Sequence, residues 1–93
     1  MIKSFADSDT ENLFNDKYVK RFDEITGPGR AKLKILNAAT TVQDLRSPPG
    51  NRLGELSGDR KGQHSIRINQ KWRICFVWSA SGAEQVEVNN HYG

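Results

Sequence analysis

Cysteine and histidine are scarce in this sequence, and their scarcity limits the chemistry open to it. Among 93 residues there is one cysteine, Cys75, and there are two histidines, His64 and His91. A single cysteine cannot close an internal disulfide, and the spacing of the three residues does not resemble a structural zinc site. Because Cys75 lies inside an apolar run, we expect a buried thiol without a chemical role, and we expect no metal or other cofactor.

Long hydrophobic runs are also missing. No stretch approaches the length of a membrane-spanning helix, and the first five residues are followed at once by Ala-Asp-Ser-Asp, which leaves no apolar segment for a signal peptide. We therefore expect a cytoplasmic protein without a membrane role. The length is that of one domain, so we expect a single domain over residues 1–93 with any active site on its surface.

Positively charged residues are in moderate excess over negatively charged ones. Lysine and arginine number 14 against 11 aspartate and glutamate, a formal net charge of +3. Such an excess favours a polyanionic partner without identifying it, and many small proteins share it by chance. The excess therefore indicates nucleic acid only if basic side chains gather at one place.

The first half of the sequence has the patterns of helices. Ser8 and Glu11 have the spacing of a capping box and predict the start of a first helix. Gly27-Pro28-Gly29 predicts a break, and residues 30–39 predict a second helix, in which Lys32 interrupts the apolar stripe and is expected to extend to solvent. The expected apolar face of this helix consists of Ala31, Ile35, Leu36, Ala38 and Ala39.

The second half predicts β-structure, after one more helical turn over residues 40–45 and the sequence Ser-Pro-Pro-Gly at 47–50, which excludes regular structure. Successive hairpins give an antiparallel sheet, to which an opening strand at residues 2–5 is added. The expected strands cover residues 51–56, 64–69, 72–78 and the stretch around 86–88.

The pairing register of the two central strands decides where two arginines point. If Ile66 opposes Ile74, the apolar side chains share one face and Arg67 lies directly opposite Arg73 on the other. A slip of one residue would turn Arg73 into the apolar set. Burial of the large apolar side chains, at about 1.5–3 kcal/mol each, favours the first register by several kcal/mol.

An arginine pair directly opposite in a sheet is destabilising, which invites an explanation. An anion such as phosphate can bridge Arg67 and Arg73. The alternative is that a nearby carboxylate folds over and neutralises them, from Glu55, Asp59, Glu84 or Glu87. Arg60 and Lys61 lie in an adjoining turn, where they either extend the basic field or form an ordinary solvated turn.

Cleavage of RNA without a metal needs a base for the ribose 2′-hydroxyl, an acid for the departing oxygen and cations over the phosphate. Arg73 and Arg67 are candidates for the cations. His91 can act as acid or base and Tyr92 as a hydrogen-bond donor or weak acid, if an end strand delivers them to the arginine face rather than leaving a frayed polar tail. His64 belongs to the apolar-facing set and is expected to be a packed core histidine.

Five stretches of the sequence form a specific pattern by their order and spacing: MIKSF at 1–5, DLRSPPGNRL at 44–53, LSGDRKG at 56–62, SIRIN at 65–69 and WRI at 72–74. Together they resemble the HigB family of the RelE and ParE toxin superfamily, and the resemblance covers nearly the whole chain. It implies an α+β, RelE-like fold in which an N-terminal strand and two to three helices pack on a twisted antiparallel sheet, with a concave active face on the other side.

Toxins of this kind enter the ribosomal A site and cut messenger RNA without a metal, so the resemblance implies a metal-independent endoribonuclease that inhibits translation. It also implies a helix-turn-helix antitoxin of the HigA type, through which alone the complex would contact operator DNA. Arg73 matches the arginine assigned to phosphate stabilisation, and with His91 and Tyr92 it forms the expected catalytic set. The residues expected to bind RNA are Arg60, Lys61, Arg67 and Asn90.

The sequence departs from the family pattern at two places. Gly54 and Ser57 stand where some members carry a histidine and a lysine, and the ending Asn90-His91-Tyr92 replaces Asp-Tyr-His. Two possible catalytic groups are therefore absent, and an acid is exchanged for an amide. Two other functions stay open on sequence alone: a ParE-like toxin that binds gyrase, and a basic RNA-binding domain without turnover.

Overall fold

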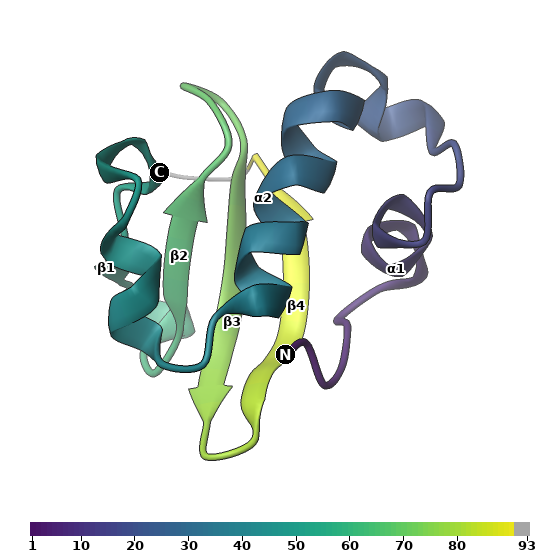
Figure 1. Cartoon of the computed structure of the whole chain (residues 1–93). Helices are drawn as coiled ribbons and strands as arrows, with labels where there is room; N and C mark the ends of the chain where they lie inside the picture. The colour runs from purple at the N-terminus through teal and green to yellow at the C-terminus, as the bar shows by residue number, and fades with distance from the viewer. Residues whose placement is uncertain (91–93) are drawn as a thin grey trace.

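The computed structural model describes residues 1–90, whose N-terminal part is helical (Figure 1). Helix α1 spans Ser8–Phe14, as predicted, but the residue that caps it differs. The carboxylate of Asp7 accepts a hydrogen bond from the Thr10 N–H at 2.7 Å, so Ser8 is the first helical residue and not the cap. The predicted capping box was therefore wrong by one residue, since the acceptor that precedes Ser8 already satisfies a free N–H of the first turn.

The 3₁₀ helix η1 (Lys20–Ile25) runs directly into helix α2 (Thr26–Ala38), so the predicted break at Gly27-Pro28-Gly29 was wrong. Pro28 fits in the first turn because N–H groups there have no partner within the helix. A Cβ atom on Gly29 would lie only 3.2 Å from Ile25 Cδ1 and 3.3 Å from Leu13 Cδ2. The glycine therefore lets α2 pack closely on α1.

The buried face of α2 also differs from the predicted one. Gly29, Leu33 and Leu36 are buried, whereas Ala31 and Ala38 are exposed. The predicted stripe followed the small alanines and omitted Leu33, whose larger side chain gains more from burial and so sets the rotation of the helix.

Lys32 does not extend to solvent as expected. Its Nζ donates a hydrogen bond to the side-chain oxygen of Asn51, which is fully buried and donates in turn to the main-chain oxygens of Leu45 and Ser47. This network attaches α2 to the loop that leads into the sheet.

That loop contains two short helical turns. The turn η2 (Val42–Arg46) was predicted, whereas the short 3₁₀ turn η3 (Pro49–Asn51) lies where the sequence excluded regular structure.

The second half of the described part contains β1 (Gly54–Glu55), the 3₁₀ turn η4 (Gly58–Arg60), β2 (His64–Arg67), β3 (Arg73–Ser79) and β4 (Gly82–Asn89). The strands form a four-stranded antiparallel sheet of order β1-β2-β3-β4 (Figure 1). Ile66 pairs with Ile74 and Arg67 with Arg73, which confirms the predicted register. The N-terminal segment contacts β4 through two isolated parallel bridges, at Ile2 and Phe5, instead of forming the expected strand.

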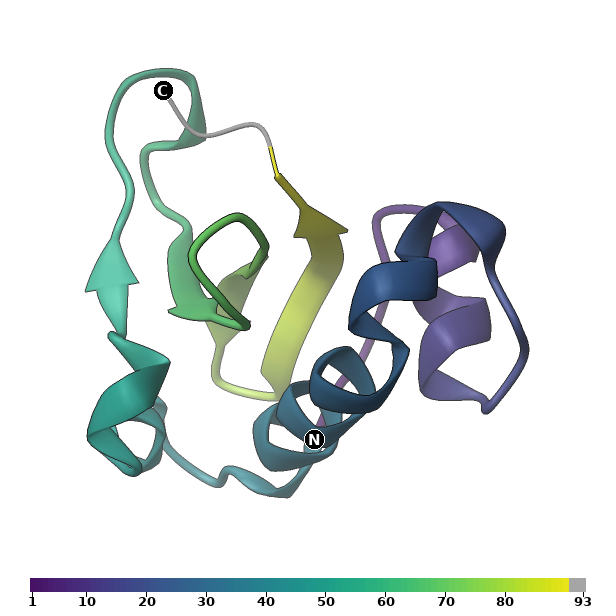
Figure 2. The ribbon, with the colours of Figure 1, turned by 90° about the horizontal axis from the view of Figure 1, so that it is seen from above.

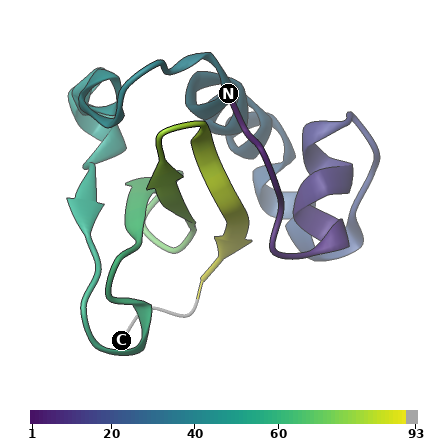
Figure 3. The same ribbon diagram turned by 90° about the horizontal axis from the view of Figure 1, so that it is seen from below.

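Helix α2 covers one face of the sheet, and α1 lies beside α2 at the edge of this layer (Figures 2 and 3). The core between α2 and the sheet includes Leu33 and Leu36 from the helix and Ile66, Ile74 and Phe76 from the strands. The architecture is therefore α+β, as predicted, and no α-helix of residues 1–90 covers the opposite face, which carries the arginines. Within the same residues, no helix is long and apolar enough to cross a membrane.

Candidate functional site: a basic cavity on the open face of the sheet

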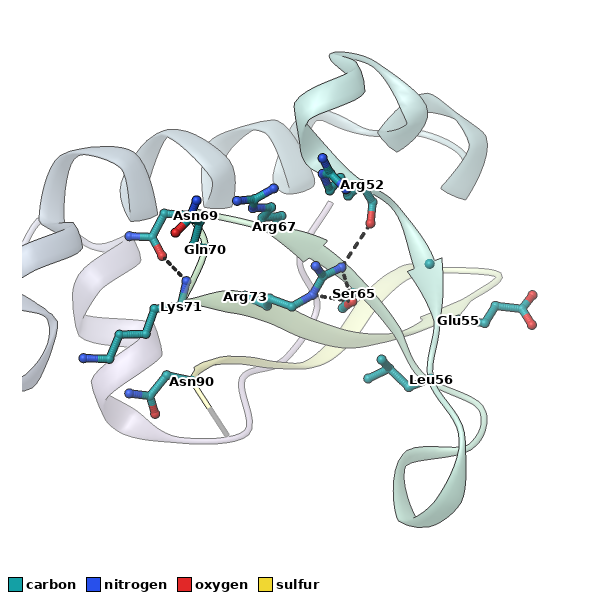
Figure 4. Close-up of a pocket in the computed structure, with 11 residues that line it drawn as sticks. Arg52, Glu55, Leu56, Ser65, Arg67, Asn69, Gln70, Lys71, Arg73 and Asn90 are labelled. Carbon is teal, nitrogen blue, oxygen red and sulfur yellow. Dashed lines mark hydrogen bonds between the residues drawn. The ribbon is translucent and has the colours of Figure 1, made fainter. Parts of the chain in front are cut away.

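The arginine-bearing side of the sheet contains a cavity of about 820 Å³ (Figure 4). Four of its lining residues are basic and one, Glu55, is acidic. Its lining therefore provides a strongly cationic surface with hydrogen-bonding groups, suited to an anion larger than a single phosphate. The basic residues are Arg52, Arg67, Lys71 and Arg73, and the polar ones include Ser65, Asn69, Gln70 and Asn90.

Arg73 is held in this cavity by groups from two other segments. Its Nε and Nη2 donate hydrogen bonds to the Ser65 hydroxyl at 2.9 and 2.7 Å, and Nη2 also donates to the Arg52 main-chain oxygen at 3.0 Å. Ser65 is only 1% exposed. The plane of the guanidinium is therefore defined by fixed acceptors, which suits a group that must meet a phosphate in one orientation.

Arg67 lies opposite Arg73 and is half-buried. Two of the four carboxylates suspected of neutralising the arginines lie near other groups: Glu87 pairs with Arg60 at 3.1 Å, and Glu55 lies 3.8 Å from His64. Among residues 1–90, no salt bridge involves Arg67. Within this part of the chain, the neutralisation hypothesis therefore fails for Arg67.

The turn residues Arg60 and Lys61 lie beside the cavity and not in its lining. Arg60 Nη1 donates to Glu87 Oε1 and to Gln63 Oε1, both at 3.1 Å, so part of its charge is balanced by β4. Lys61 is exposed. The two residues remain predicted RNA contacts at the periphery.

Asn90 is the last described residue and lines the cavity. The predicted catalytic residues His91 and Tyr92 lie outside residues 1–90, so their assignment stays a prediction.

Several cavity residues, among them Arg52, Lys71 and Ser65, were not singled out from the sequence. Arg52 follows η3 with φ 46° and ψ 53°, a left-handed conformation that no local pattern indicated. Lys71 lies in the turn between the two arginine-bearing strands, and Ser65 stands two residues before Arg67 on the same strand face. The turn and the period-two spacing were signals from which Lys71 and Ser65 could have been found.

The turn that carries Lys71 is attached to η1. Trp72 Nε1 donates to Glu24 Oε1 at 2.6 Å, and Lys71 Nζ lies 3.4 Å from the same oxygen. The Trp72 hydrogen bond, followed by the Lys71 charge, lowers the pKa of Glu24. The rim of the cavity is thus connected to the helical layer through an ionised carboxylate.

His64 and Cys75 are not among the residues that line the cavity. The His64 ring stacks on Phe76 with centroids 6.0 Å apart, and its Nδ1 is buried without a hydrogen-bond partner among residues 1–90. Cys75 is fully buried, as expected, with Asn89 Nδ2 3.7 Å from its sulfur. Within the described part of the chain, no three His, Cys, Asp or Glu side chains group as they would around a metal ion.

Comparison with known proteins identifies the family of the chain. The profile of the RelE-like toxin HigB of type II toxin-antitoxin systems matches residues 3–92. The chain belongs to the HigB-like toxin family. It is 41% identical to "Toxin HigB-1" of Vibrio cholerae over 76 aligned residues, and the alignment covers 70% of this chain and 80% of that protein. An uncharacterized protein of Haemophilus influenzae is 38% identical over 61 residues, covering 66% of this chain and 55% of its own.

The resemblance seen in the sequence motifs is therefore confirmed at the level of the family. A toxin of a toxin-antitoxin system has an antitoxin as its partner. The basic cavity of this HigB-like toxin is lined by two of the predicted RNA contacts, Arg67 and Asn90, together with Arg73.

Proposed function

We propose that this HigB-like toxin is an endoribonuclease that cuts messenger RNA in the ribosomal A site and thereby inhibits translation. The observation that carries the proposal is the cavity on one side of the sheet, whose lining includes Arg52, Arg67, Lys71 and Arg73. A set of basic side chains fits the closely spaced phosphates of an RNA strand. Arg73, oriented by Ser65, is the group best placed to stabilise charge on a phosphate under attack.

The reaction that fits these groups is attack of a ribose 2′-hydroxyl on the adjacent phosphate. A base takes the hydroxyl proton, the bond to the 5′-oxygen of the next nucleotide breaks, and an acid protonates that oxygen. Arg73 would stabilise the crowded phosphate, and His91 and Tyr92 would transfer the protons. Arg67 and Asn90 would hold the strand, with Arg60 and Lys61 at its periphery.

Dependence on the ribosome follows from the weakness of this acid–base set. Gly54 and Ser57 replace two side chains that supply chemistry in some relatives. An enzyme with few strong acids and bases relies on substrate held in line for attack, and the ribosome can provide that geometry. We expect the purified toxin to cut messenger RNA on programmed ribosomes and naked RNA poorly; equal rates on both would contradict this explanation.

The deciding experiment is induction of the chain alone in a bacterial host, with mapping of messenger-RNA ends and assay of DNA supercoiling. In-frame cuts within codons support the nuclease, whereas gyrase-linked DNA breaks without cuts support the ParE-like alternative. Growth arrest with neither points to RNA binding without turnover. Arg73→Ala should remove the cuts, and Lys34→Ala, which deletes an exposed charge on α2, is the matched control for net charge.

We further propose that the antitoxin is a helix-turn-helix protein of the HigA type, that toxin and antitoxin meet in the cytoplasm, and that operator DNA is contacted only by the antitoxin. Co-expression with a helix-turn-helix protein encoded beside the toxin should restore growth and give a complex that copurifies. Unimpaired growth with soluble toxin alone would argue against neutralisation as the reason for the pairing.

A further inference from the structure

The buried hydroxyl of Ser65 lies where it can control the orientation of Arg73 in the cavity. Ser65 Oγ accepts hydrogen bonds from both Nε and Nη2 of Arg73. We infer that Ser65 is a positioning residue, which sets the Arg73 guanidinium for the phosphate under attack. The inference rests on the proposed ribonuclease function and adds a residue to it.

The strand register explains why Arg73 needs such a partner. Ser65 pairs with Cys75 and Arg67 pairs with Arg73, so Ser65 is the diagonal neighbour of Arg73 and Arg67 the direct one. Like charges directly opposite in a sheet repel each other. The hydrogen bonds draw the Arg73 guanidinium along the sheet toward Ser65 and away from the position that faces Arg67 (Figure 4).

The main-chain oxygen of Arg52 completes the orientation from a third segment. It accepts from Arg73 Nη2 at 3.0 Å, at the point where the chain leaves η3 in the left-handed conformation. The two acceptors belong to β2 and to the loop before β1, so the guanidinium is held from two directions. Rotation of the guanidinium is therefore restricted by two parts of the fold at once.

Ser65 carries no charge, which separates its role from that of the arginines around it. Removal of the hydroxyl leaves all four cations in the cavity, so RNA binding should change little, while the orientation of Arg73 should be lost. Misplaced catalytic groups slow the chemical step far more than they weaken binding. For Ser65→Ala we expect single-turnover cleavage to fall by about 10- to 100-fold, with the half-saturating ribosome concentration changed by less than about threefold.

The test compares wild type, Ser65→Ala, Ser65→Thr and Ser65→Cys in single-turnover cleavage on programmed ribosomes. Threonine retains the hydroxyl and should restore most of the rate, while cysteine, a weak acceptor of similar size, should be intermediate. Ser79→Ala is the matched control, because Ser79 lies at the other end of β3 and its hydroxyl also makes a hydrogen bond, to the Gly82 main-chain oxygen. Ser79→Ala should cut like the wild type.

A second measurement observes Arg73 directly. In ¹⁵N-labelled toxin, the Nε–H of Arg73 should exchange slowly with water in the wild type and in Ser65→Thr, and rapidly in Ser65→Ala. A folded Ser65→Ala protein with wild-type cleavage, or with an unchanged Arg73 signal, overturns the inference. Loss of RNA binding in step with cleavage also overturns it.

The two measurements separate this inference from the function on which it rests. If the wild type itself does not cut ribosome-bound messenger RNA, the proposed function fails, and the Arg73 signal alone then decides whether Ser65 orders the guanidinium. If the wild type cuts and Ser65→Ala cuts equally well, the proposed function stands and the positioning role fails. If Ser65→Ala does not fold, the cleavage rates of Ser65→Thr and Ser65→Cys decide. A faster rate for Ser65→Thr than for Ser65→Cys supports the inference, and the absence of this difference overturns it.

Discussion

Replacement of Arg73 by alanine is the perturbation that most directly tests the proposed site. Among residues 1–90, the variant removes three hydrogen bonds, two to the Ser65 hydroxyl and one to the Arg52 main-chain oxygen, together with one positive charge in the cavity. We expect toxicity to be abolished, while folding and antitoxin binding stay largely intact.

The expected size of the effect differs greatly between catalysis and stability. A charged donor that stabilises the transition state is worth about 3–4 kcal/mol, which corresponds to a rate loss of about 100- to 1,000-fold. In the folded protein the buried Ser65 oxygen loses its donors, at a cost of about 1–3 kcal/mol, and relief of repulsion with Arg67 returns about 0.2–1 kcal/mol. The net loss is smaller than the usual stability of a domain, so the variant should remain folded.

The assay is single-turnover cleavage on programmed ribosomes, with thermal unfolding and antitoxin copurification as controls for folding. Arg73→Lys keeps the charge but not the planar fork, so it should recover only part of the lost rate. If folded Arg73→Ala cuts at the wild-type rate while a variant lacking His91 and Tyr92 is inactive, the phosphate assignment is refuted and catalysis belongs to the C-terminal residues.

Four further predictions follow from the fold and the site. Arg67→Ala should slow cleavage less than Arg73→Ala in the same assay, because neighbouring cations also hold the strand. Phe76→Ala, at a fully buried position, should lose about 3–5 kcal/mol and largely unfold, as circular dichroism would record. Cys75→Ala should stay toxic if folded, since we assign the thiol no chemistry. Glu24→Gln should be less stable than wild type at neutral pH in denaturant titrations. Because the pKa of Glu24 is lowered in the folded state, this difference should be present above the ordinary glutamate pKa and vanish as the pH falls through the folded value.

The central strand pairing was predictable because its information is local. Alternation in β2 and β3 leaves one register that buries Ile66 and Ile74, and that register places Arg67 against Arg73. The antiparallel order of the sheet followed from successive short turns in the same way. These features depend on period-two burial, which a single sequence displays directly.

The remaining parts depend on contacts between segments far apart in the sequence. The rotation of α2 is set by what packs on Leu33, and the hydrogen bond from Lys32 reaches Asn51, 19 residues away. The Arg52 carbonyl meets Arg73 only because the loop turns in a left-handed conformation, which sequence patterns do not indicate for arginine. Periodicity therefore predicted which arginines share a face, but the groups that orient them required the three-dimensional structure.

The arginine pair Arg67 and Arg73 depends both on the predictable strand register and on contacts between distant segments. A sheet gains nothing in stability from guanidiniums on directly opposite residues, and the surrounding carboxylates Glu55 and Glu87 are engaged with His64 and Arg60. Among residues 1–90, Arg73 donates hydrogen bonds to neutral oxygens, from Ser65 and from the Arg52 main chain. Neutral acceptors orient a guanidinium without cancelling its charge, whereas a carboxylate would do both. Orientation by these oxygens therefore leaves the positive charge of the guanidinium in place, which is a property that a phosphate-binding site requires.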